Sequence, residues 1–257
     1  MAWDSSILDM VLVPLGLLVL AAYHAHLWFK LKSKPESTVI GVNHLNRQAW
    51  VINIMSDSGK NGIVAVQTLR NSIMASTLLA STAITLSSVI AALVSSTTSG
   101  GTDNTLRHFI YGETGNITST LKYLCLLLCF LFAFVCHVQS IRYANHASFL
   151  LSIPVGDNAP GLTPEYVNEF IYMSQNFFTL GLRGYYLAFP LLLWIFGPIP
   201  MFVCSIVMVF LLRTLDKAKN FNLTFKILSK NEKDENGEKD VKSTGQDGTD
   251  LHQILSV

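Results

Sequence analysis

Long apolar blocks alternate with polar segments along this chain, and the blocks have the length of membrane-spanning helices. They lie at about residues 7–29, 73–94, 121–138, 178–197 and 199–213. A hydrocarbon core of about 30 Å needs roughly 20 helical residues. The pattern therefore predicts an all-α fold, a polytopic helical membrane bundle of four to five transmembrane helices within residues 1–220.

The last apolar region leaves the number of spans open. Its centre is Gly197-Pro198-Ile199-Pro200, which must break or kink a helix. One kinked span would place the carboxyl terminus outside, whereas a hairpin of two spans would place it in the cytosol. Arg213 and Lys217 follow the region, so the positive-inside rule favours the hairpin and five crossings.

The charged residues that flank the spans predict the orientation. Lys30, Lys32 and Lys34 follow the first block directly, which predicts a cytosolic loop there and an amino terminus that is outside or lumenal. We expect a multi-pass protein of the plasma membrane or an endomembrane, with its carboxyl terminus in the cytosol. Residues 229–250 are rich in Lys, Glu, Asp, Asn and Gly and contain almost nothing apolar, which predicts a disordered cytosolic tail over residues 221–257.

Two segments next to the spans predict helices outside the bilayer. The polar run 66–71 leads straight into the second block, so that helix, like others, should have a long cytosolic extension. In the first cytosolic loop, Val42, Leu45, Ala49 and Ile52 recur at helical spacing. This pattern predicts a short amphipathic helix that lies on the membrane or against the bundle.

The second block carries two stripes of small residues. The first predicts close helix packing and consists of Ser72, Ser76, Ala80, Ala83, Ser87 and Ala91. The second consists of Thr77, Ser81, Thr85 and Ser88. An alternative interpretation is a hydroxyl-lined path along this span, as in a small oligomeric transporter or channel.

A polar, basic cluster is the candidate binding site. Gln and Arg recur three residues apart, on one helix face, in Gln67–Arg70 and Gln139–Arg142. We hypothesise that Arg70, Arg142 and Arg183 face one cavity at the cytosolic boundary and bind an anion or lipid headgroup. The full candidate set is Gln67, Arg70, Asn71, Gln139, Arg142, Asn145, His146 and Arg183. The alternative is that each arginine only anchors its helix among the headgroups.

Composition narrows the function classes. The chain has 257 residues, of which 50% are hydrophobic and 14% charged, and its net charge is +1, so we expect no nucleic-acid partner. No His-Glu-x-x-His or Gly-x-Ser-x-Gly motif is present, so we expect no enzyme, cofactor or metal. The preferred prediction is a membrane scaffold or regulator that contacts the bilayer, anionic headgroups and other copies of itself. A lipid-modifying enzyme that uses His146 or His24 is a third interpretation.

Several motifs resemble one family. They are Ala22-Tyr23-His24, the run from Ala65 to Met74, the run from Arg142 to Leu150, and the run from Leu191 to Pro198. On these motifs the chain resembles a plant family of multi-span membrane proteins known only as domain of unknown function 599. The resemblance covers roughly residues 7–220. It implies helical membrane architecture and a plant source, and it carries no reaction and no site to transfer.

Overall fold

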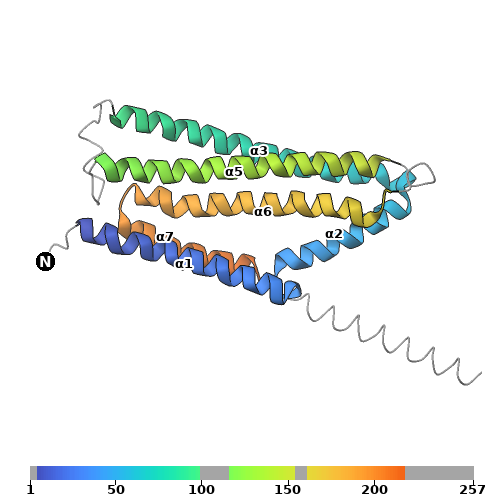
Figure 1. Ribbon diagram of the computed structural model, residues 1–257, viewed down its shortest axis with the longest axis horizontal. Coiled ribbons are helices and arrows are strands. Elements are labelled where there is room, and N and C mark those ends of the chain that lie inside the picture. Colours follow the sequence, from blue (N-terminus) through green and yellow to red (C-terminus); the bar gives the residue numbers. More distant parts are fainter. Residues whose placement is uncertain (1–4, 99–115, 154–160, 218–257) are drawn as a thin grey trace, which may run out of the picture.

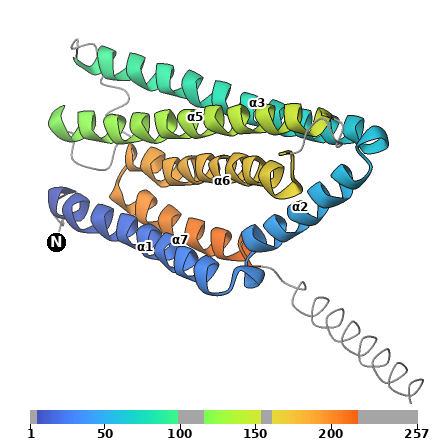
Figure 2. The ribbon, with the colours of Figure 1, turned by 45° about the vertical axis from the view of Figure 1, so that its right-hand side comes forward.

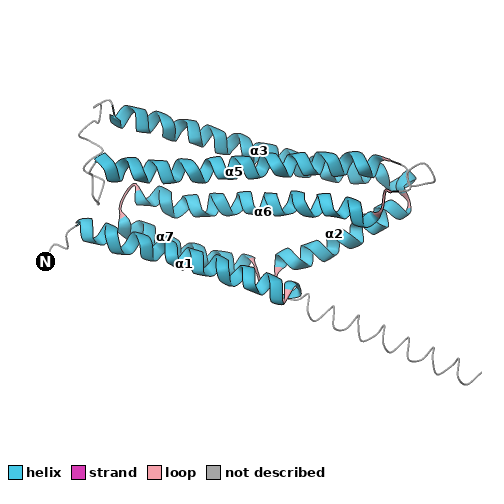
Figure 3. Cartoon of the chain, viewed as in Figure 1, coloured by secondary structure: helices cyan, strands magenta, loops and turns pink. Residues whose placement is uncertain are grey.

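The described part of the chain folds into helices (Figure 1). The computed structural model describes residues 5–98, 116–153 and 161–217. Its elements are α1 (Ser5–Ser33), a one-turn 3-10 helix (Pro35–Ser37), α2 (Val39–Ser56), α3 (Ser58–Thr98), α5 (Asn116–Ser152), α6 (Pro164–Trp194) and α7 (Pro198–Leu215). These ranges contain no β-strand (Figure 3), which confirms the all-α prediction. The predicted tail at 221–257 lies outside the described residues.

Five helices have the length and composition to cross a membrane. Their candidate spans are Ile7–Ser33, Asn61–Ser95, Thr118–Leu151, Pro164–Trp194 and Pro198–Leu215. The hairpin is confirmed, because α6 ends at Trp194 and α7 begins at Pro198. Gly197 joins them with a φ of 157° and a ψ of 169°, a backbone conformation that glycine adopts almost alone.

The spans form two groups that lie side by side. Helices α3, α5 and α6 run next to one another, and α1 and α7 form a pair beside α6 (Figures 1 and 2). A Cβ atom at Gly16 would lie 3.1 Å from Ser205 Oγ, so a glycine there lets α1 approach α7 closely. Helix α2 runs obliquely from the end of α1 to the start of α3 (Figure 2). We call this end of the bundle the α2 end.

The buried apolar side chains form two cores. The span core joins α1, α3, α5, α6 and α7 through Val13, Ile90, Leu126, Phe130, Ala188, Leu191, Trp194 and Met201. The α2-end core joins α2, α3, α5 and α6 through Val51, Ile54, Met55, Ala65, Leu69, Ala147, Leu150, Leu151, Val167 and Ile171. Helices α3, α5 and α6 thus extend past α1 and α7, and α2 packs against the extension.

The packing face of α2 differs from the predicted one. Of the four predicted residues only Val42 is buried, whereas Leu45 is 40% and Ile52 is 49% exposed. The buried face continues from Val42 through Val51, Ile54 and Met55 instead. The predicted helix is confirmed as α2, and its apolar residues lie on more than one side. The choice between those sides depends on α3, α5 and α6, which the local pattern does not contain.

Candidate functional site

A contact between two serines sets the relative height of α3 and α5. Ser76 Oγ lies 3.4 Å from Ser140 Oγ, and the two helices are antiparallel. With a rise of 1.5 Å per residue, Arg70 is about level with His146, and Arg142 lies roughly 6 Å closer to the span core. Asn71 and Asn145 are likewise about level. The candidate residues of α3 and α5 therefore lie at similar levels near the α2 end.

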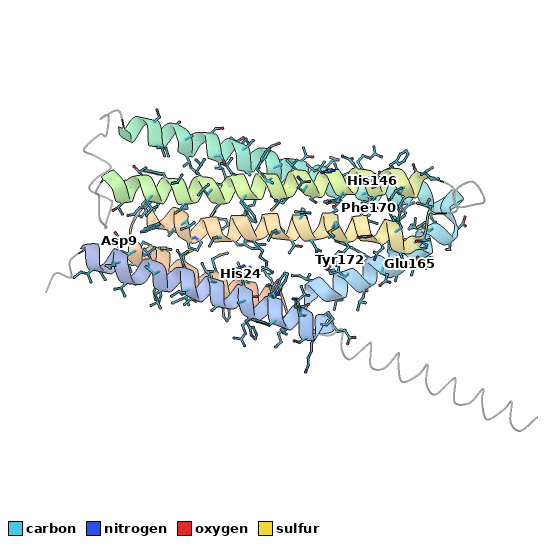
Figure 4. All side chains as sticks on the ribbon, in the orientation of Figure 1. Asp9, His24, His146, Glu165, Phe170 and Tyr172 are labelled. Atoms are coloured by element: carbon cyan, nitrogen blue, oxygen red, sulfur yellow. The ribbon has the colours of Figure 1, made fainter. Side chains whose placement is uncertain are left out.

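These side chains form a surface, not a cavity. The exposed members are Gln67, Arg70, Asn71, Arg142, Asn145 and His146, and we call them the arginine surface. Gln139 is only partly exposed. Arg70 Nη2 donates a hydrogen bond to Gln67 Oε1 at 3.0 Å. His146 packs edge-on against Phe170 of α6, with 4.4 Å between the ring centroids (Figure 4).

The charge of the arginine surface is not balanced within its helices. Neither α3 nor α5 contains an Asp or Glu along its length. Among the described residues, neither Arg70 nor Arg142 takes part in an ion pair. Two acids lie near the start of α6, Glu165 (Figure 4) and Glu169, and both are exposed. The two guanidinium groups therefore remain open to an external anion.

Arg183 lies apart from this surface. Ser140 Oγ and Ser174 Oγ are 3.2 Å apart, which places Arg183 about level with residue 131 of α5. It is thus roughly 16 Å from the level of Arg142. Its Nη2 donates to Asp216 Oδ1 at 2.5 Å, and these side chains are 12% and 11% exposed. The prediction that three arginines share one cavity is corrected, because Arg183 is paired with a carboxylate at the end of α7.

The Arg183–Asp216 pair connects four helices at the α2 end. Tyr23 of α1 donates from its hydroxyl to Asp216 Oδ2 at 2.6 Å, and the backbone N–H of Val39 donates to the Asp216 carbonyl at 3.1 Å. A carboxylate at a helix carboxyl end is electrostatically unfavourable unless a cation compensates it, and Arg183 does so. One sequence signal pointed to this pair: Asp216 is the only acidic residue between Phe170 and Lys230.

A second buried ion pair lies at the opposite end of the bundle. Lys122 Nζ is 3.9 Å from Asp9 Oδ2, and both side chains are nearly inaccessible (Figure 4). Trp194 Nε1 donates to Asp9 Oδ1 at 3.0 Å, and the Lys122 ammonium lies 5.5 Å from the Trp194 ring centroid. Sequence analysis did not predict this group, which links α1, α5 and α6.

The hydroxyl groups of α3 have two different environments. On the first stripe Ser76, Ala80, Ala83 and Ser87 are buried, as expected for close packing. On the second stripe Thr77, Thr85 and Ser88 are exposed and donate to carbonyls of their own helix. The second stripe thus faces the outside of the bundle.

Comparisons with known proteins identify the family. No curated protein and no solved structure matches the chain. The model of the family described as "Protein of unknown function, DUF599" matches residues 11–221, which span all the helices except the first residues of α1. This match covers most of the chain and confirms the resemblance seen in its motifs. The chain therefore belongs to the DUF599 family of multi-span helical membrane proteins.

Proposed function

We propose that this protein is a non-catalytic membrane scaffold or regulator that holds anionic lipid headgroups on the arginine surface. One observation carries the proposal: Arg70 and Arg142 are exposed on adjacent helices that contain no acidic residue. Guanidinium groups match phosphate geometry and form charge-assisted hydrogen bonds with it. Asn71, Asn145 and His146 supply further polar groups beside them.

The depth of the arginine surface fits a headgroup ligand. Helix α7 has 18 residues and is about 27 Å long, close to the thickness of a hydrocarbon core. Asp216, at the end of α7, pairs with Arg183. Arg142 and Arg70 both lie nearer the α2 end than Arg183 does, so they lie beyond this contact. If the end of α7 marks the membrane boundary, the two arginines lie on the headgroup side of it.

The other interpretations have less support. A channel along α3 would need free hydroxyls that line a path, but Thr77, Thr85 and Ser88 donate to their own helix. An enzyme would need a nucleophile or metal site, and the sequence lacks the common motifs for either. A binding role needs only the exposed basic surface.

Lipid retention by the purified protein tests the proposal. The double variant Arg70→Gln and Arg142→Gln is compared with the control Lys32→Gln and Lys34→Gln, which removes the same charge from the end of α1. Each basic group near a membrane contributes about 1 kcal/mol, which both double variants lose, and hydrogen bonds to a charged headgroup add about 1.5–3 kcal/mol. We therefore expect the arginine variant to weaken phosphatidylserine binding at low salt at least about tenfold more than the lysine control does. Phosphatidylcholine binding should not change. If the two double variants weaken phosphatidylserine binding equally, binding depends only on the amount of positive charge and not on its position, and the proposed site is refuted.

A further inference from the structure

A cavity of about 520 Å³ lies between α1, α5 and α6, away from the arginine surface. Its walls are apolar, with Leu17 and Leu20 from α1, Leu128 and Phe132 from α5, and Leu187 from α6. Two polar side chains also line it, His24 and Arg183. Cavities of roughly 300–1,000 Å³ that combine apolar walls with a few polar groups are typical binding sites for small molecules.

The packing of the helices explains why this space is open. Helix α1 packs against α7, and α7 packs against α6, so α1 does not pack closely along α5. On the other side, a Cβ atom at Gly184 would lie 3.2 Å from Ala133 Cβ, which shows how closely α6 approaches α5 there. The tight contacts on both sides leave the gap between α1 and the α5–α6 pair. An opening between α1 and α5 would face the bilayer.

The cavity has a polar end and an apolar end. Helix α1 runs toward the α2 end and α6 runs away from it. His24 (labelled in Figure 4) is therefore the lining residue of α1 nearest the α2 end, and Arg183 is that of α6. Leu17, Leu128 and Leu187 lie deeper toward the middle of the spans. This polarity matches that of a lipid in the adjoining leaflet, whose head lies at the boundary and whose body points inward.

The polar groups at that end have unused hydrogen-bonding capacity. Arg183 Nη2 is bonded to Asp216, but Arg183 Nη1 is buried without a hydrogen-bond partner. His24 Nδ1 is 2.8 Å from the Leu20 carbonyl, which only accepts, so Nδ1 is the donor of this hydrogen bond. In the tautomer with its proton on Nδ1, His24 Nε2 is an acceptor. Arg183 Nη1 and His24 Nε2 are thus the donor and the acceptor at this end of the cavity.

We propose that this cavity binds one compact lipid with an apolar body and a single uncharged hydroxyl head, of the sterol class. The hydroxyl oxygen accepts from Arg183 Nη1, and the hydroxyl proton is donated to His24 Nε2. Asp216 already neutralises Arg183, so a carboxylate or sulfate head would leave an uncompensated negative charge in an apolar site. This site is separate from the arginine surface, so the two proposals stand or fall independently.

Photolabelling tests the cavity directly. The full-length protein in phosphatidylcholine vesicles is labelled with a photoreactive sterol that keeps its free hydroxyl, and the labelled peptides are identified by mass spectrometry. We expect labels on α1, α5 and α6 near the lining residues. Leu187→Trp and, independently, Leu17→Trp fill the cavity and should reduce labelling at least tenfold, whereas Val203→Trp on the exposed face of α7 should not. Thermal unfolding confirms that each variant is folded.

Competition by analogues tests the assigned hydrogen bonds. A sterol ketone accepts from Arg183 but cannot donate to His24, so it should compete roughly three- to tenfold less well than the sterol. In the variant His24→Phe the two should compete equally. Labels that fall outside the three helices, or full labelling of both cavity-filling variants, would overturn the site. Stronger competition by a sterol sulfate or a fatty acid than by the free sterol would overturn the uncharged head.

Discussion

Removal of the Asp216 carboxylate should destabilise the bundle more than any nearby surface substitution. In the variant Asp216→Asn, Arg183 keeps a guanidinium that is only 12% exposed but loses its counter-ion. Tyr23 also loses its charged acceptor. Separating a buried ion pair by removing one partner costs about 3–5 kcal/mol, and the remaining exposure puts the expected loss near the lower limit, about 3 kcal/mol.

Unfolding by SDS titration in mixed micelles measures this effect as a free energy of unfolding. Arg213→Gln is the control, because Arg213 is exposed one turn before Asp216, and we expect a change within about 0.5 kcal/mol. A double-mutant cycle of Arg183→Gln and Asp216→Asn should give a coupling free energy above about 1 kcal/mol. If the two substitutions are additive, the pair does not hold the α2 end together and the reasoning fails.

Two further predictions concern the packing of α6. The variant Gly181→Ala places a Cβ atom 2.7 Å from Nε2 of the fully buried His137, and should lower the free energy of unfolding by about 1–3 kcal/mol; a stability equal to that of Gly62→Ala, whose Cβ meets only an ordinary 3.7 Å contact, would contradict this. Burial, together with the positive charge of Arg47, lowers the pKa of His44 below its usual 6.5. As the pH falls below about 6.5 the unfolded chain takes up this proton first, so stability should decrease, and His44→Gln should flatten that decrease in an unfolding series from pH 7 to 5; an unchanged slope would exclude His44 as the cause.

Local features could be predicted from the sequence, and contacts between distant segments could not. The hairpin followed from Gly197 and Pro198, because both act on the backbone where they stand. The level of Arg183 depends on how α6 packs against α5, which Ser140 and Ser174 fix across the interface. Its partner Asp216 lies on a third helix, so the spacing of Gln and Arg motifs could not identify it.

The candidate functional residues also include some that the sequence could predict and some that it could not. The candidate residues of α3 and α5 lie at similar levels because these helices are antiparallel neighbours, so matching motifs lie near the same end. The cavity between α1, α5 and α6 was not predicted, because it depends on which helices do not pack together. Its polar residue His24 lies with His26 near the end of an apolar block, and nothing in that local pattern linked it to Arg183.

During synthesis, α2 leaves the ribosome well before α6, which supplies part of the α2-end core. The apolar face of α2 at Val51 and Ile54 packs with Val167 and Ile171, which the ribosome adds more than a hundred residues later. At about 5–20 residues per second, α2 waits roughly 5–20 s for this partner. Its exposed Leu45 and Ile52 allow it to rest on the bilayer surface meanwhile. A nascent chain arrested before Pro164 therefore presents an uncovered hydrophobic helix, the kind of surface that chaperones and quality-control proteases recognise.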